Sequence, residues 1–111
     1  MKIPGIGRAL RTRETLRFLS RPRAVVLLYH RVANVSRDPQ LLSVEPERFE
    51  AHLRLLRGKY HPVSIAELVD SIERGSLSRG TVAVTFDDGY LDNLVNAAPL
   101  LEHFEIPATV F

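Results

Sequence analysis

Short apolar runs mark three strands along the chain. The run AVVLLY over residues 24–29 is continuous and rich in β-branched residues, which predicts a strand covered on both faces, as in parallel sheets. The run TVAVTF over residues 81–86 has Gly80 before it and the turn residues Asp87, Asp88 and Gly89 after it, and it predicts the clearest strand. Residues 106–111 predict a third strand.

A first amphipathic helix is predicted over residues 46–58. Phe49, Leu53 and Leu56 recur there at i, i+4 and i+7 and would form one apolar face. Pro46 suits the first helical turn, where its missing N–H would have no partner. Gly58 is expected to end the helix.

A second helix follows His61 and Pro62, which are expected to lie in a turn. Ser64 and Glu67 have the spacing of a capping box, in which each side chain satisfies the other's free backbone N–H. Gly75 is the expected exit. The apolar positions of this helix are Ile65, Leu68, Val69 and Ile72.

A third helical segment is predicted over residues 90–104, with Pro99 expected to kink or divide it. Its apolar positions are Leu91, Leu94, Val95, Ala98 and Leu101. Residues 31–44 contain turn-forming side chains and predict a surface loop. Strands that alternate with helices in this way predict right-handed βαβ units on a parallel sheet, and therefore an α/β fold.

Composition narrows the chemistry open to these 111 residues. The chain has no cysteine, so any metal must be held by His, Asp or Glu. Residues 1–31 hold eight basic side chains and one acidic one, whereas residues 32–111 carry a net charge of −5. We expect residues 1–23 to form a solvated basic arm that binds neither nucleic acid nor membrane, because no set of stacking aromatic residues is interleaved with its arginines. The sequence shows no export signal or membrane anchor, which favours a cytoplasmic location.

The candidate chemistry lies at the carboxyl ends of two predicted strands, where parallel α/β folds bind ligands. His30 follows the first strand, and Asp87 and Asp88 follow the second. Two adjacent ionised carboxylates repel each other unless a cation or a shared proton relieves them. One carboxylate could ligate a metal while the other accepts a proton from water, so the pair indicates metal-assisted hydrolysis.

The residues around this pair resemble the first signature motif of the polysaccharide deacetylases, also known as carbohydrate esterase family 4 or the NodB-homology group. That motif is TFDDGY over residues 85–90. The resemblance extends from about residue 24 to residue 111, through VLLYHRV at 26–32, the helix at 49–60, VSIAEL at 63–68, PLL at 99–101 and IPATVF at 106–111. It implies the amino-terminal part of a deformed (β/α) barrel of the glycoside hydrolase/deacetylase type, over residues 24–111.

The same resemblance implies a role for each matching site residue. Asp87 would be the general base, and Asp88 would ligate a divalent metal, usually zinc. His30 and Tyr90 would line the substrate pocket. The implied reaction is hydrolysis of an N-acetyl, or sometimes an O-acetyl, group on a carbohydrate substrate.

The sequence departs from the family in its histidines. The family's second motif, H-x-x-x-H, supplies two metal ligands, and the residues four positions beyond His52, His61 and His103 are Leu56, Ile65 and Pro107. Since even catalytic zinc sites use three protein ligands, we expect this chain to be inactive alone. Three strands cannot close a barrel, so we also expect a truncated domain whose last strand is an exposed apolar edge.

Two alternatives remain open at this point. The chain could act as a half-domain that associates with a complementing chain carrying the missing histidines. An acidic pair at a strand end also suits a magnesium-dependent phosphoryl-transfer domain. That alternative fits the flanking sequence poorly, because Lys2 and Lys59 both precede the acidic pair and such domains need a later lysine.

Overall fold

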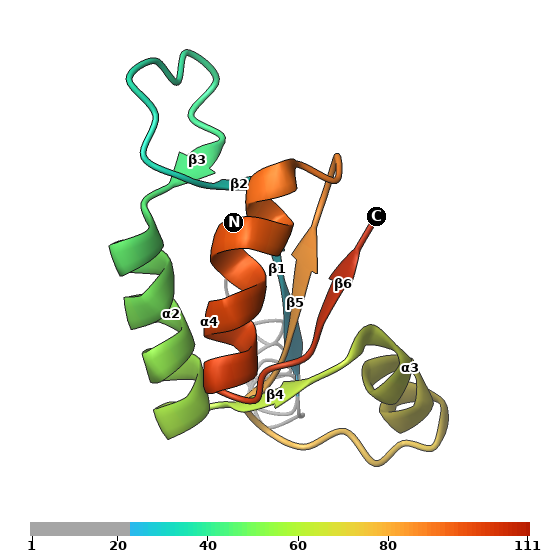
Figure 1. Ribbon diagram of the computed structural model, residues 1–111. Coiled ribbons are helices and arrows are strands. Elements are labelled where there is room, and N and C mark those ends of the chain that lie inside the picture. The colour runs from blue at the N-terminus through green and yellow to red at the C-terminus, as the bar shows by residue number, and fades with distance from the viewer. Residues whose placement is uncertain (1–22) are drawn as a thin grey trace, which may run out of the picture.

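A computed structural model of the chain describes residues 23–111, so the expected basic arm lies outside the described residues except for Arg23. Strands and helices alternate along the described part (Figure 1). The elements in chain order are β1 (Ala24–Tyr29), β2 (Arg31–Val32), β3 (Ser43–Val44), α2 (Pro46–Lys59), β4 (His61–Val63), α3 (Ile65–Glu73), β5 (Thr81–Phe86), the π-helix η1 (Asn93–Ala97), α4 (Ala98–His103) and β6 (Ala108–Val110).

Strand β5 is the centre of a four-stranded sheet in which every pairing is parallel, as the alternation of strands and helices predicts. β1 pairs with the whole of β5, with Ala24 opposite Thr81 and Tyr29 opposite Phe86. On its other side β5 pairs first with β4 and then with β6. All six residues of β5 are buried, so the prediction of a strand at 81–86 is confirmed.

The main core lies on one face of this sheet. α2 and α4 lie side by side against it (Figure 1). Phe49, Leu53 and Leu56 of α2 are all buried, which confirms the predicted apolar face of that helix. They pack with Tyr29 of β1 and with alternate residues of β5, namely Val82, Val84 and Phe86.

The opposite face of the sheet is only partly covered, and here the sequence prediction is wrong. α3 packs its buried Leu68 with Val63 and Ala83 near the beginning of β5. Val26 and Leu28 of β1 are 51% and 53% exposed, although the continuous apolar run predicts burial on both faces. Val25, on the other face of β1, is 54% exposed as well, whereas β5 is buried on both faces. The exposure therefore follows the position of β1 at the edge of the sheet.

The helix ends agree with the sequence at α3 and differ at α2. The capping box of α3 is present, with the Ser64 hydroxyl accepting from the backbone N–H of Glu67. Gly75 follows the end of α3 with a φ of +66°, as the expected exit requires. Gly58 does not end α2, because the helix continues to Lys59 and stops where Tyr60 becomes extended.

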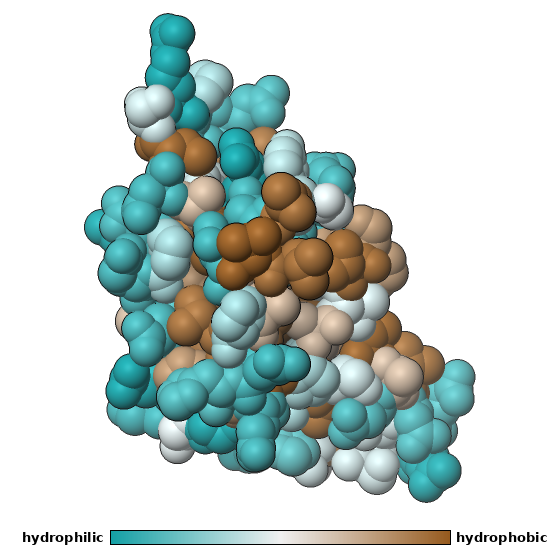
Figure 2. Space-filling view, viewed as in Figure 1, coloured by the Kyte–Doolittle hydropathy of each residue, from teal (hydrophilic) through white to brown (hydrophobic). Residues whose placement is uncertain are grey.

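The predicted apolar face of the third helical segment is confirmed only in its second half, where Leu101 packs against the main core. Leu91, Leu94 and Val95 are exposed, whereas Asn93 and Ala97 are buried. The space-filling view shows apolar side chains gathered over η1 and alongside β6 (Figure 2). The winding changes immediately before Pro99, from the π-turn of η1 to the α-turns of α4, while the backbone stays helical from residue 91 to residue 103. A π-turn is wider than an α-turn, which gives the proline ring room against the carbonyl group four residues earlier.

Two short strand pairings replace predicted loops. Arg31 and Val32 pair in parallel with Ser43 and Val44, inside the segment that predicts a surface loop. Strand β4 includes His61 and Pro62, which the sequence places in a turn. β2, β3 and β4 are too short to show an alternating pattern, so the sequence carries no signal for them.

Candidate active site

The strand ends bring His30 and the acidic pair together. Because Tyr29 stands opposite Phe86, the residues that follow β1 and β5 meet at the same edge of the sheet. The backbone N–H of Asp87 donates to the Tyr29 carbonyl at 3.0 Å. The Nδ1 atom of His30 lies 3.4 Å from Oδ2 of Asp88. Two of the three strand-end residues that the sequence selects are therefore in contact, and the third, Asp87, is bonded through its backbone to the residue before His30.

A tight turn presents the two carboxylates differently. Asp88 has a φ of +71° and Gly89 a φ of +57°, so the chain leaves β5 through two consecutive left-handed residues. Aspartate tolerates this conformation better than most residues with a side chain. Asp87 is half-buried, whereas the Asp88 side chain is 61% exposed. Asp88 is thus open to an ion from outside, and Asp87 stays close to the end of the strand.

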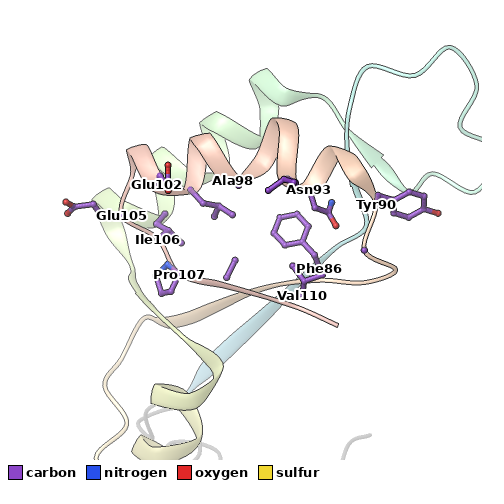
Figure 3. Close-up of a pocket in the computed structure, with 13 residues that line it drawn as sticks. Phe86, Tyr90, Asn93, Ala98, Glu102, Glu105, Ile106, Pro107 and Val110 are labelled. Carbon is purple, nitrogen blue, oxygen red and sulfur yellow. The ribbon is translucent and has the colours of Figure 1, made fainter.

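Tyr90 takes a different position from His30 and the acidic pair. The guanidinium carbon of Arg31 lies 4.9 Å from the centre of its ring, a cation–π contact. Tyr90 lines one end of an apolar groove between η1, α4 and β6, with its ring directed outward (Figure 3). Tyr90 is half-buried and stands at the rim of the turn that carries Asp87 and Asp88.

Three polar side chains that the sequence analysis did not select hold the segment after β1. The Asp92 carboxylate accepts from the Val32 backbone N–H at 2.9 Å and from Arg31 Nε at 3.1 Å. Asn93 Nδ2 donates to the His30 carbonyl at 3.0 Å, and Asn96 Nδ2 donates to the Val32 carbonyl at 2.7 Å. We call Asp92, Asn93 and Asn96 the polar clamp. Its sequence signal was the presence of three polar residues within five positions of a segment that otherwise has apolar helical spacing.

The apolar groove lies near these residues and is lined by neither member of the acidic pair. It has a volume of about 630 Å³ and lies between α4 and β6, with Asn93 towards one end and Glu102 towards the other (Figure 3). Phe86 and Ile106 form part of its wall. Neither Asp87 nor Asp88 lines it, so the candidate chemistry sits at the end of the strands and outside this groove.

The donor set of the described residues is incomplete for a metal. Within residues 23–111, no three His, Asp or Glu side chains stand close enough together to hold one. Asp88 and His30 are the two donors in contact, whereas His52 Nδ1 lies 2.9 Å from the Tyr29 hydroxyl. His103 stacks edge-on against Phe104. A zinc site with three protein ligands would need at least one donor from beyond these residues.

A parallel α/β sheet with an acidic pair and a histidine at adjoining strand ends defines an α/β domain whose candidate site lies at the carboxyl ends of its strands. The comparisons with known proteins give the family. A sequence model described as "Polysaccharide deacetylase" matches residues 74–111. The poly-beta-1,6-N-acetyl-D-glucosamine N-deacetylase of Escherichia coli K12 is 33% identical over 86 residues, which are 76% of this chain. The chain belongs to the polysaccharide deacetylase family.

Solved structures of the family share the fold. IcaB from Ammonifex degensii is 36% identical with a TM-score of 0.71 and covers 79% of this chain. The Streptococcus pyogenes deacetylase PplD, solved in complex with acetate, is 26% identical with a TM-score of 0.71 and covers 78%. The fold is therefore the expected α/β arrangement, part of a (β/α) barrel of the deacetylase type.

The matches span only part of each relative. The chain covers 13% of the Escherichia coli protein, 37% of the IcaB chain and 41% of the PplD chain. In the part of the chain that the structure describes, no helix combines the length and the apolar character needed to cross a membrane.

Proposed function

We propose that this chain supplies the first acidic motif of a deacetylase that removes acetyl groups from N-acetylated, or O-acetylated, polysaccharide. The observation that carries the proposal is the meeting of His30 with Asp88 beside Asp87 at the end of β5. The name of the Escherichia coli relative, an N-deacetylase of an N-acetylglucosamine polymer, supports the substrate class.

The proposed roles follow from where each side chain stands. Asp87 accepts a proton from the attacking water, since it is half-buried and close to the strand end. The water oxygen bonds to the acetyl carbon, the C–N bond breaks as the nitrogen takes up the proton that the water has lost, and acetate and a free amine leave. His30, which contacts Asp88, and Tyr90, which lies under Arg31, are proposed to line the sugar pocket.

Asp88 is proposed to hold a divalent metal, zinc by family resemblance, because it is the exposed carboxylate of the pair. When bound, the metal would polarise the acetyl carbonyl. Asp88 provides one ligand, and the remaining ligands would come from residues beyond 23–111 or from a complementing chain. We therefore propose that residues 23–111 by themselves do not catalyse the reaction.

A segment exchange tests these roles in a complete domain. Residues 23–111 would replace the matching segment of the Escherichia coli deacetylase, and acetate release from poly-N-acetylglucosamine would be measured. We expect the chimera to be active. Asp87→Asn should lower turnover at least about 100-fold, while the metal content stays unchanged. Asp88→Asn should lower the metal content itself.

Asp70→Asn is the matched control, because Asp70 lies on α3 and pairs with Arg74 at 3.1 Å. It should change neither metal content nor turnover. Undiminished metal in the Asp88 variant, or full activity of the Asp87 variant, would show that the roles are assigned wrongly.

A further inference from the structure

The segment that carries His30 lacks strand partners along one of its edges. The backbone N–H groups of Arg31 and Ala33 donate to Leu42 and Val44, on the side of β3. The His30 carbonyl and both backbone groups of Val32 face the other way, where no strand lies within the described residues. Buried backbone groups of this kind need partners, and here side chains provide them.

The polar clamp supplies those partners from η1. Asn93 donates to the His30 carbonyl, Asp92 accepts from the Val32 N–H, and Asn96 donates to the Val32 carbonyl. The Val32 side chain is fully buried in the main core, so the residue two positions after His30 is fixed on every side. The side chains of η1 and its preceding residue Asp92 therefore hold the second edge of the backbone from which the His30 side chain projects.

The hydrogen bond from Asn93 to the His30 carbonyl places a polar side chain in a buried position. The residue is only 8% exposed and belongs to the helical turn that packs Ala97 into the core. Its Nδ2 atom is used by the His30 carbonyl, but its Oδ1 atom is buried without a partner among the described residues. An apolar side chain would avoid this orphaned acceptor, so the donor is what the asparagine contributes.

We infer that Asp92, Asn93 and Asn96 are positioning residues, which hold the His30 ring against Asp88 by fixing the backbone that carries it. The inference rests on the proposed function for the importance of His30 and Asp88, but the contact itself can be measured without turnover. Arg31 connects Asp92 to the other proposed pocket residue, because it donates to the Asp92 carboxylate and lies over the Tyr90 ring.

The test reads the His30 ring by NMR in the full 111-residue chain. Long-range ¹H–¹⁵N spectra resolve the ring nitrogens of the four histidines, and His30→Gln assigns the signals of His30. In an otherwise wild-type chain, Asp88→Asn should shift the Nδ1 resonance of His30, because Nδ1 faces the Asp88 carboxylate. In an Asn93→Leu background the same replacement should no longer produce that shift.

Two controls separate positioning from general loss of stability. Leu68→Ala removes a buried side chain from the smaller core and touches no clamp residue, so the response to Asp88→Asn should persist. If Asn93→Leu does not fold, Asp92→Ala and Asn96→Ala are read in the same way. The inference is overturned if a folded clamp variant keeps the full response, or if Leu68→Ala abolishes it. Because no step requires catalysis, failure here is distinct from failure of the deacetylase assay.

Discussion

At the scale of single residues, Tyr29 joins the core to the surface of α2. Its ring packs edge-on against Phe49, with ring centres 5.0 Å apart, and stacks on Phe86 at 5.6 Å. Its hydroxyl lies 2.9 Å from Nδ1 of His52. Burial raises the pKa of the Tyr29 hydroxyl above its ordinary value, because the phenolate would lose its hydration there.

Tyr29 should therefore make the chain lose stability in alkali. With a folded-state pKa above the unfolded value of 10.0, the neutral hydroxyl stabilises the fold fully below that pH, and this stability is lost as the pH rises through the folded pKa. Urea unfolding of the wild type at about pH 9 and about pH 11 should show a larger decline than in Tyr29→Phe. Val63→Ala, which removes no ionisable group, should decline as the wild type does. An equal decline in Tyr29→Phe would contradict the assignment.

At the scale of elements, the two glycines near helix ends have opposite roles. Gly58 lies inside α2, has no positive φ, and a Cβ placed there meets nothing within 4 Å. Gly75 also has open space but a φ of +66°, which disfavours any side chain.

Alanine should therefore affect these two positions in opposite directions. We expect Gly58→Ala to raise the free energy of unfolding by about 0.5–1 kcal/mol, because alanine loses less backbone entropy in a helix. Gly75→Ala should lower it by about 1 kcal/mol through strain in the left-handed conformation. Chemical denaturation of both variants measures this, and a destabilising Gly58→Ala would mean that α2 ends before Gly58.

The sequence predicts an element correctly where the residue pattern of that element alone determines its structure. β5 and the buried face of α2 follow directly from residue spacing, and the capping box of α3 needs only two side chains three positions apart. The strand-end rule likewise placed His30 near the acidic pair. The face of η1 could not be read in this way, because hydrogen bonds to a distant segment outweigh the apolar spacing of Leu91, Leu94 and Val95.

At the scale of the whole molecule, the central strand β5 is covered on both faces, whereas the edge strand β1 is not. Neighbouring strands therefore carry the same type of residue in opposite environments: Val26 of β1 is 51% exposed, and Val84 of β5 is 1% exposed. Val25 and Leu28 of β1 are also more than half exposed, at 54% and 53%. Apolar surface that stays open in this way favours association between copies in solution.

Threonine replacements separate the two environments at nearly constant shape. Val84→Thr buries a hydroxyl in the main core and should lower the free energy of unfolding by about 1–3 kcal/mol. Val26→Thr keeps the β-branch on an exposed face and should change it by no more than about 0.5 kcal/mol. Combined with Leu28→Thr, it should also reduce concentration-dependent association in sedimentation experiments, since the double replacement removes apolar surface from the exposed edge strand. If Val26→Thr cost as much stability as Val84→Thr, β1 would have to be covered on both faces in solution, as its continuous apolar run predicts.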